Sequence, residues 1–480
     1  MWFTHSHIAA VPPPTSKRHN VPYPAIHWLD DDILLGMFNC YRRDDEHLWN
    51  LQLLWCRLSH VCQRWRHLIH ECAVHLGMHI KCTNGSPILD TLDHLPPLPL
   101  FISYTPITIP TEQDELGIYH ALRLHGCVRH IKLVLLPSIL HNVVILMGEH
   151  FPMLEHLSLS FAATIENSRP LTLPRAFLAP NLLHLALVGI GIPKRLRALT
   201  STNSLVTLKL SKIQASSYFR PRVLVARLAS LPNLKVLSIE FSAPIPRPRT
   251  ESELLGENGT LVTLPSLKRL QFKGVSAYLE SLVAQIRVPL LVQLEITLFN
   301  QIAFALPHLS YLISITEALK LPKAIVGFDH KEVYVTTAHH SPQWFGRGPF
   351  LLRVTCKPLD WQIDCAAQIC QALIPALSGV ERFRLICYHT KIPTEWQNGA
   401  VDGTTWHELL RSFIGLKELY VDEALLDELS CALRVDEVAS DPAFLPNLRS
   451  INAARTLFAS FIDARRVVDR PVAFSWWRYF

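Results

Sequence analysis

The sequence of 480 residues has few charged residues and no closely spaced cysteine pair of the CxxC type. Only 18% of the residues are charged, the net charge is +6, and no long block of like charges occurs, so a nucleic-acid-binding surface is not indicated. The 11 cysteines contain no CxxC pair, and their odd number argues against a disulfide framework and for a reducing compartment. Apolar residues make up 49%, and the length suggests about two to four domain-sized units.

Neither a secretory signal nor a membrane-spanning run is recognisable. The first residues, MWFTHSHIAAVPPPTSKRHN, lack the apolar core of a signal peptide, and residues 1–24 read as a flexible, proline-containing leader. The most apolar later run, Leu133 to Met147, is interrupted by Pro137, His141 and Asn142. We therefore expect an intracellular protein, located in the cytoplasm, the nucleus or both.

Motifs of the common enzyme classes are also missing. The sequence has no Walker loop, HExxH, GxSxG or glycine-rich nucleotide motif. His339 and His340 follow Asp329 and His330 without the spacing of a metal site, so we expect no metal, no cofactor and no catalytic residue. An unrecognised enzymatic site between Asp329 and His340 is one alternative, which predicts a polar pocket with perturbed pKa values there.

Two helices are predicted between residues 25 and 72. The aspartates Asp30 to Asp32 precede the apolar residues Ile33, Leu34, Met37 and Phe38, and acidic side chains favour the first turn of a helix. After a polar link, apolar residues recur every three or four positions and predict one further helix with a single apolar stripe. This second stripe consists of Leu51, Leu54, Leu58, Val61, Cys62, Trp65, Leu68 and Cys72.

From residue 73 onward the sequence is repetitive. Seven segments carry a proline two residues before a leucine: FPMLEHLSL, APNLLHLAL, LPNLKVLSI, LPSLKRLQF, VPLLVQLEI, LPHLSYLIS and LPNLRSINA. Related segments without the proline are TNSLVTLKL, GCVRHIKLV, SGVERFRLI and IGLKELYV. The first leucines at 154, 182, 205, 234, 267 and 291 are 23 to 33 residues apart, which predicts an irregular leucine-rich-repeat-like α/β solenoid over residues 73–480. The alternative is a set of unrelated strands in another α/β domain.

Each unit is expected to contribute one strand, covered by segments with helical spacing such as SAYLESLVAQIR and WHELLRSF. The polar strand positions then form two columns on the concave face. The first column contains His156, His184, Thr207, Val236, Arg269 and Gln293, and the second contains Ser158, Ala186, Lys209, Ser238, Gln271 and Glu295. Neither column has a dominant charge or an aromatic ridge, so the sequence indicates no substrate class.

Three features depart from a regular repeat. The asparagine or cysteine that usually satisfies backbone groups after the last leucine is replaced by Ala162, Ile190, Ile213, Ser242, Val275 and Phe299. The segment KAIVGFDHKEVYVTTAHH predicts a β-hairpin near residues 323–338, with its turn at Asp329 and His330. The final AFSWWRYF is predicted to cap the last unit, with an exposed aromatic peptide motif as the alternative.

The segments WLDDDILLGMF and LSHVCQRWRHLI together resemble an F-box. The first half of the motif matches at Leu29, Ile33, Leu34 and Phe38, and the second at Leu58, Val61, Cys62, Trp65, Arg66 and Leu68. Asp30 stands where the motif has proline, and Asp32 where it has glutamate. Two further segments, TNGSPILDTLDHLPPLPLFISY and FIDARRVVDRPVAFSWW, are similar to segments of the large fungal family of F-box proteins with irregular leucine-rich C-terminal regions.

The resemblance implies a non-enzymatic substrate-recognition adaptor of an SCF-type (cullin-RING) ubiquitin ligase. The F-box module, residues 25–72, would bind a Skp-type adaptor and through it a cullin by helix-in-groove contacts. The solenoid would bind a protein substrate, and neither nucleic acid nor a membrane is an expected partner. The residues that would either bind the adaptor or hold the module together are Leu29, Ile33, Leu34, Phe38, Leu58, Val61, Cys62, Trp65 and Leu68.

The alternative function is a leucine-rich protein-interaction scaffold that is not linked to ubiquitination. In that case the N-terminal helices would pack their apolar stripe wholly against the solenoid as a cap. The two hypotheses differ in one observable property, since a docking surface should leave Phe38, Leu58 and Trp65 partly exposed.

Overall fold

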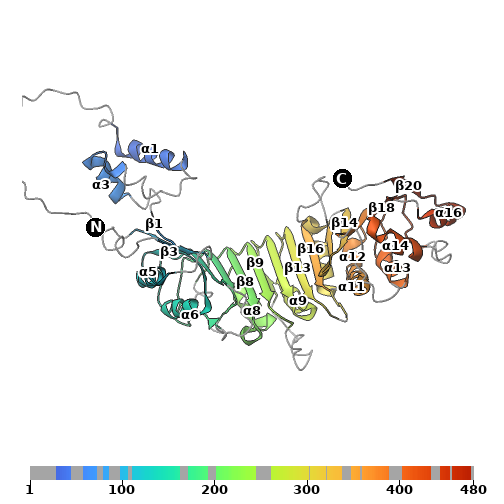
Figure 1. Ribbon diagram of the computed structural model, residues 1–480, viewed down its shortest axis with the longest axis horizontal. Coiled ribbons are helices and arrows are strands. Elements are labelled where there is room, and N and C mark those ends of the chain that lie inside the picture. Colours follow the sequence, from blue (N-terminus) through green and yellow to red (C-terminus); the bar gives the residue numbers. More distant parts are fainter. Residues whose placement is uncertain are drawn as a thin grey trace, which may run out of the picture. The chain divides into compact units, whose positions relative to one another are not determined.

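The computed structural model divides into two compact units, residues 1–80 and 81–480 (Figure 1). The sequence predicts this boundary after Cys72, and the predicted leader at residues 1–24 lies outside the described residues. The structure describes residues 29–44, 58–72, 79–85, 98–105, 111–162, 171–192, 202–244, 261–301, 303–320, 322–337, 348–356, 359–388, 403–433, 444–454 and 457–476.

The described part of the first unit contains the helices α1 (Asp31–Asp44) and α3 (Gln63–Glu71). α1 begins within the aspartate run, with Asp31 and Asp32 in its first turn, where carboxylates oppose the positive end of the helix dipole. The predicted single helix through Leu58 and Leu68 is wrong. Cys62 has an extended backbone (φ −158°, ψ 170°), so the chain turns there and α3 begins at the next residue.

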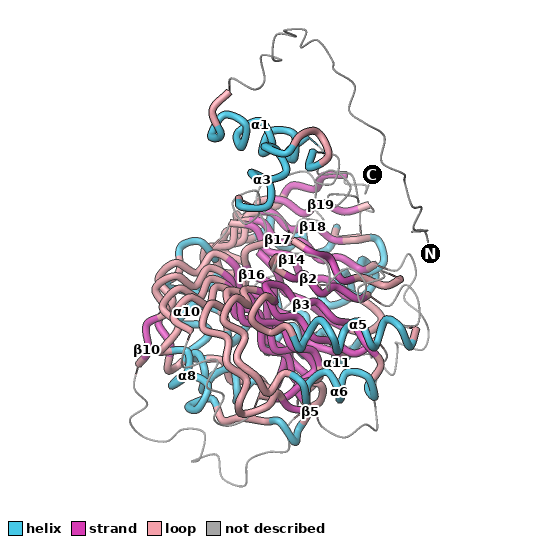
Figure 2. The backbone as a smooth tube through the Cα atoms, turned by 90° about the vertical axis from the view of Figure 1, so that its left-hand side faces the viewer, coloured by secondary structure: helices cyan, strands magenta, loops and turns pink. Residues whose placement is uncertain are grey.

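The second unit has a mixed α/β fold with one large, mostly parallel sheet. Its strands follow one another along the sheet in chain order from β2 to β13, so each connection returns across the same face (Figure 2). In sheet order the strands are β1 (Ile80–Cys82), β2 (Leu100–Tyr104), β3 (Val128–Leu135), β4 (His156–Phe161), β6 (His184–Val188), β8 (Thr207–Ile213), β9 (Val236–Phe241), β11 (Arg269–Gly274), β13 (Gln293–Phe299), β16 (Phe350–Thr355), β15 (Glu332–Thr337), β14 (Lys323–Phe328), β17 (Arg382–Cys387), β18 (Glu418–Val421), β19 (Ser450–Ala453) and β20 (Ala473–Trp476).

Helices and short irregular elements make the connections. The helices are α5 (Glu112–Arg123), α6 (Pro137–Leu146), α8 (Pro221–Leu228), α9 (Ser276–Val283), α10 (Pro307–Ile315), α11 (Leu359–Ala372), α12 (Ile374–Leu377), α13 (Gly403–Arg411), α14 (Leu426–Ala432) and α16 (Ala459–Val467). The short elements are β5 (Leu171–Thr172), β7 (Ile190–Gly191), β10 (Val262–Thr263), β12 (Ile286–Arg287) and the 3-10 turns η2 (Ala215–Ser217), η4 (Glu317–Leu319) and η6 (Glu423–Leu425).

The alternating aliphatic residues of each strand form the core of this unit. In β4, Leu157 and Leu159 are fully buried, and the equivalent positions of β6, Leu185 and Leu187, are buried as well. The polar residues between them lie on the opposite face of the sheet. The strand register aligns both predicted columns residue by residue, from His156 through Gln293 and from Ser158 through Glu295. We call this side of strands β2 to β13 the column face.

A proline turn introduces most of these strands. In six of the seven predicted segments the leucine N–H donates to the carbonyl oxygen three residues earlier, as in Leu182 to Ala179 at 3.2 Å. Proline then occupies the second position of a β-turn, where its fixed φ is favourable. The prediction of a strand in the remaining segment, LPHLSYLIS, is wrong, because Pro307 is at the start of α10 and the buried Leu309 and Leu312 have helical spacing.

Asparagines link successive turns, although not at the position expected from regular repeats. The Nδ2 of Asn181 donates to the carbonyl oxygen of Pro152 at 2.7 Å, and that of Asn233 to the carbonyl oxygen of Asn203 at 2.9 Å. Each of these asparagines follows the proline of its own turn and donates to a backbone carbonyl oxygen in the turn before the neighbouring strand. This ladder therefore satisfies backbone carbonyl groups in the turns before the strands, not those after the last leucine that the asparagine of a regular repeat would bind.

The parallel arrangement of the strands is interrupted at β15. β14 and β15, which lie within the stretch predicted as a hairpin, pair antiparallel with each other, and β15 also pairs antiparallel with β16. β14 pairs in parallel with β17, which continues the sheet toward β20. β20 is the last strand in the sheet order, and its Trp476 is 68% exposed; residues 477–480 of the predicted cap lie outside the described residues.

Removing one rung of the asparagine ladder should destabilise the sheet. We expect Asn181→Ala to lower the free energy of unfolding by about 1 kcal/mol, since one hydrogen bond between units is lost. Urea unfolding monitored by circular dichroism measures the difference. Asn142→Ala is the control: its Nδ2 also donates a hydrogen bond, to Tyr119 Oη at 3.3 Å, but alanine in the helix α6 compensates for the loss. An equal loss in both variants would contradict a specific role of the ladder.

Candidate binding surfaces

The first unit has a small core made from both helices. Leu34, Phe38, Leu68 and Ile69 are buried, and Leu29, Leu35, Leu58 and Trp65 pack against them while partly exposed. Phe38 and Trp65 make an edge-to-face contact with ring centroids 4.8 Å apart. Of the three side chains that docking was expected to leave partly exposed, Phe38 is buried (2% exposed), because it lies between α1 and α3.

Polar contacts fix the angle between the two helices. The guanidinium of Arg64 donates to Asp31 Oδ1 from Nε (3.0 Å) and from Nη2 (2.6 Å), and Nη2 also donates to the carbonyl oxygen of Leu29 (2.6 Å). Cys62 caps α3, with its Sγ 3.5 Å from the backbone nitrogen of Trp65. Arg66 Nε donates to the carbonyl oxygen of Ser59 at 3.1 Å and holds the turn before α3. No pattern in the sequence indicates the pairing between Arg64 and Asp31.

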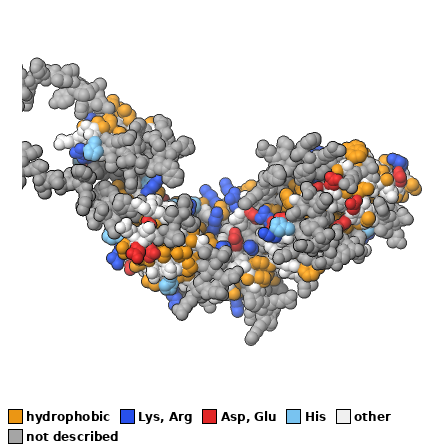
Figure 3. All heavy atoms as spheres, viewed as in Figure 1, with side chains coloured by type: hydrophobic (Ala, Val, Ile, Leu, Met, Phe, Trp, Pro, Cys, Tyr) orange, Lys and Arg blue, Asp and Glu red, His pale blue; other side chains and the backbone are white. Residues whose placement is uncertain are grey.

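Three apolar side chains of this unit are turned to solvent. Ile33 and Met37 are 51% and 45% exposed and lie one helical turn apart on α1, and Val61 before α3 is 58% exposed. Figure 3 shows hydrophobic side chains on the surface of this unit. The nine predicted residues therefore separate into packing residues (Leu29, Leu34, Phe38, Leu58, Trp65, Leu68), a helix cap (Cys62) and exposed residues (Ile33, Val61). Met37 was missed as a site residue, although its spacing of four from Ile33 indicates it.

The column face of the second unit carries a row of stacked rings. His130 pairs in register with His156 and His156 with His184, and the bulged pairing of β2 with β3 adds Phe101 to the row. The ring centroids are 5.4 Å apart from Phe101 to His130, 4.1 Å from His130 to His156 and 5.7 Å from His156 to His184. We call these four residues the ring column. The predicted column, which begins at His156, therefore continues for two more strands, and Phe101 and His130 add rings that were not predicted as part of it.

The surroundings of the ring column are basic. Strands β2, β3, β4, β6 and β8 contain no Asp or Glu at any position. Lys132 and Lys209 are exposed in the adjacent column, and Arg129 Nε pairs with Glu155 Oε2 at 2.9 Å beside the start of β4. Figure 3 shows Lys and Arg side chains on the upper side of the sheet, above the region of β8 and β9.

Burial lowers the pKa of His156 below its usual value, and the nearby positive groups of His184 and Lys132 lower it further. The imidazole is therefore held in its neutral form at a pH at which a solvent-exposed histidine would begin to bind a proton. An anion placed next to the ring would oppose this shift.

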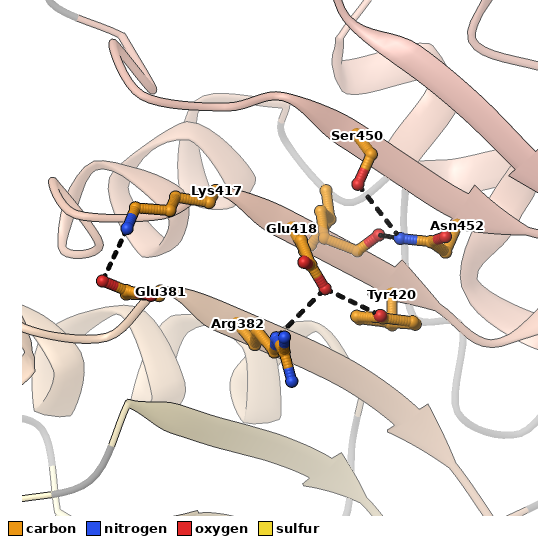
Figure 4. Close-up of polar contacts among 8 residues, drawn as sticks. Glu381, Arg382, Lys417, Glu418, Tyr420, Ser450 and Asn452 are labelled. Carbon is orange, nitrogen blue, oxygen red and sulfur yellow. Dashed lines mark hydrogen bonds and ion pairs between the residues drawn. The ribbon is translucent and has the colours of Figure 1, made fainter.

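At the other end of the sheet the charges are paired with each other (Figure 4). Arg382 Nε lies 3.2 Å from Glu418 Oε2, which also accepts a hydrogen bond from Tyr420 Oη at 2.8 Å. Lys417 Nζ lies 2.6 Å from Glu381 Oε1, and this contact lowers the pKa of Glu381. Burial and the carboxylate of Glu418 raise the pKa of Tyr420. These carboxylates compensate the basic groups beside them, in contrast to the region around the ring column.

The region suggested as an alternative enzymatic site forms a hairpin turn. Asp329 Oδ1 accepts hydrogen bonds from the backbone nitrogen of His330 (2.7 Å) and lies 2.6 Å from its Nδ1. His339 and His340 lie outside the described residues, and the part of the chain that the structure describes contains no cluster of metal-ligating side chains. None of the helices within the described ranges combines the length and the apolarity needed to cross a bilayer.

Truncating the core of the first unit should separate its helices. We expect Phe38→Ala to destabilise this unit by about 3 kcal/mol, because so few side chains are buried in it. Limited proteolysis should then cleave residues 29–72 much faster than in the wild type. Ile33→Ala on the same helix is the matched control and should change stability by less than about 0.5 kcal/mol, since Ile33 is exposed. Equal cleavage rates for the two variants would be incompatible with this core.

The lowered pKa of His156 should make the sheet less stable in acid. As the pH falls, the unfolded chain binds a proton at an ordinary histidine pKa of about 6.5, whereas the folded chain binds it only at lower pH. The free energy of unfolding should therefore decrease between about pH 7.5 and about pH 5.5, and this decrease should be smaller in His156→Phe. Urea unfolding at the two pH values measures it, and an unchanged pH dependence in the variant would refute the prediction.

Comparisons with known proteins assign no family to the chain. No protein-family model matches it, and no curated protein matches it. Among solved structures, the crystal structure of a TLR13–ssRNA13 complex matches with a TM-score of 0.32 and 13% sequence identity. The match covers 82% of this chain and 48% of that chain, so the present chain spans about half the length of that protein.

Proposed function

We propose that this protein is a substrate-recognition adaptor of an SCF-type ubiquitin ligase. The first unit binds a Skp-type adaptor, and the second unit, an irregular leucine-rich-repeat-like solenoid, binds a protein substrate. The observation that carries the proposal is the separation of roles among the residues that resemble an F-box: six form a shared core, while Ile33 and Val61 stay exposed. An amphipathic module of this kind presents apolar anchors without unfolding itself.

The exposed side chains supply what a helix-in-groove contact needs. Ile33 and Met37 lie on the same face of α1, so one groove of a partner can accept both. Asp30 and Asp32, which depart from the F-box motif, are exposed, and α1 begins between them at Asp31, which pairs with Arg64. The departure from the motif is therefore compatible with a formed first helix.

An interaction scaffold outside ubiquitination is the second candidate, and the extent of the column face favours it equally. Two aligned columns of mostly polar residues extend across β4 to β13, an arrangement of the type that solenoids use for binding. This property of the second unit is shared by both candidates. Only binding to a Skp-type adaptor separates them.

Co-purification of the full chain with a Skp-type adaptor tests the proposal. We expect the double variant Ile33→Asp, Val61→Asp to weaken binding by about 30-fold or more, because charges replace two apolar anchors. Both side chains are exposed, so the fold of the unit is expected to persist, which circular dichroism and limited proteolysis check.

The matched control carries the same charge change elsewhere on the chain. Ile145 and Val467 are 62% and 87% exposed, on α6 and α16, and the double variant Ile145→Asp, Val467→Asp should bind like the wild type. If the wild type does not bind at micromolar concentration, the adaptor function is wrong and the scaffold remains. If both double variants lose binding equally, the predicted contact residues are wrong.

A further inference from the structure

We propose that the column face of strands β2 to β8 binds an extended acidic protein segment. The imidazoles of His130 and His184 and the ammonium groups of Lys132 and Lys209 bind its carboxylates, whereas His156, whose Nδ1 is buried, contributes through its charge when it is protonated. This inference concerns residues 81–480 and does not rest on the binding of an adaptor by the first unit.

The geometry of the ring column favours contacts through ring edges. His130 and His156 are nearly parallel, with an interplanar angle of 12° and a centroid distance of 4.1 Å, and Phe101 stacks on the other side of His130 at 22°. Both faces of His130 are therefore occupied, by Phe101 and His156, and are not available for stacking on nucleic-acid bases. The edges of an imidazole carry its N–H groups, which donate hydrogen bonds to anions, most strongly when the ring is protonated.

The charge distribution selects an acidic partner. The five strands of this region contain no carboxylate, whereas β9 contains Glu240 and β13 contains Glu295. Glu295 pairs with Arg353 Nη1 at 3.2 Å, and Arg353 Nε also pairs with Glu332 at 3.3 Å, so the basic group there is already bound to carboxylates of this chain. Lys132 and Lys209 make no ion pair with a described residue, and a segment with carboxylates would compensate both.

The spacing fits an extended chain. Lys132 on β3 and Lys209 on β8 occupy the same column and are separated by three steps between neighbouring strands, or about 14 Å. Two side chains on the same face of an extended peptide, four residues apart, are separated by about 13–14 Å. One segment lying across the strands can therefore place a carboxylate near each lysine and others along the ring column.

The same arrangement makes binding depend on pH. The charged and titratable groups around His156 are His130 and Lys132 on β3, His184 on β6, Lys209 on β8, and the pair of Arg129 and Glu155 beside the start of β4. Most of these groups are basic and disfavour protonation of the free ring. A bound carboxylate favours protonation, so the segment should bind more tightly as the pH decreases.

Fluorescence anisotropy with the full chain tests the proposal. The probe is a fluorescein-labelled peptide of alternating Glu and Ser, about ten residues long, which places all glutamates on one face when extended. We expect its affinity to increase about tenfold between about pH 7.5 and about pH 5.5, where glutamate stays ionised. His156→Phe keeps a ring in the column and should reduce this increase. The double variant Lys132→Gln, Lys209→Gln should weaken binding about fivefold at both pH values.

Three comparisons make the outcome decisive. Arg123→Gln with Arg222→Gln changes the net charge equally on the exposed surfaces of α5 and α8 and should leave the affinity unchanged. Equal weakening by this control, or equal binding of a Gln–Ser peptide, would overturn the proposal. Tighter binding of a labelled oligo-dT, lost in the same lysine variant, would assign the face to nucleic acid instead. The assay contains no Skp-type adaptor, so its failure is distinguishable from failure of the proposed adaptor function.

Discussion

Parallel pairing of consecutive strands is the constraint on which the second unit depends. Each strand buries aliphatic residues on only one face. A single strand with its connection therefore cannot form a core, and the next strand must continue the core in register. The proline turns and the asparagines after them set this register before the strand begins, since Asn181 and Asn233 bind the turn of the preceding unit. Every polar column on the opposite face follows from this alignment.

The register could be predicted from the sequence because side chains alternate between the two faces of a strand. The leucines mark the residues that face the core, and the residues between them then lie on the column face. Both columns from His156 to Gln293 and from Ser158 to Glu295 are therefore correct. The ring column was missed because its first members, Phe101 and His130, precede the first proline turn, and a bulge offsets β2 from β3. The strand predicted after Pro307 was wrong because a Pro-x-Leu pattern also fits the first turn of a helix.

In the first unit, the sequence predicted which residues matter but not the role of each. Ile33 and Leu34 are adjacent and equally apolar, yet one is 51% exposed and the other fully buried, because α3 covers only one side of α1. Helical periodicity identifies an apolar stripe, and the position of the partner helix decides which part of it is covered. That position is set by contacts between residues far apart in the sequence, the packing of Phe38 on Trp65 and the ion pair of Arg64 with Asp31.

The reversed strand β15 has a consequence for the order in which the sheet assembles during synthesis. Residues up to Phe299 are sufficient to pair β2 through β13, because each of these strands joins the one made before it. The hairpin of β14 and β15 reaches the growing edge only through β16, which lies between β13 and β15 although it is made after both. β16 therefore closes the sheet, and the strands from β17 to β20 form a second row that extends from β14. During synthesis the first row of strands can therefore join the hairpin as soon as residues 350–355 are available, before β17 to β20 are made and extend the sheet from β14.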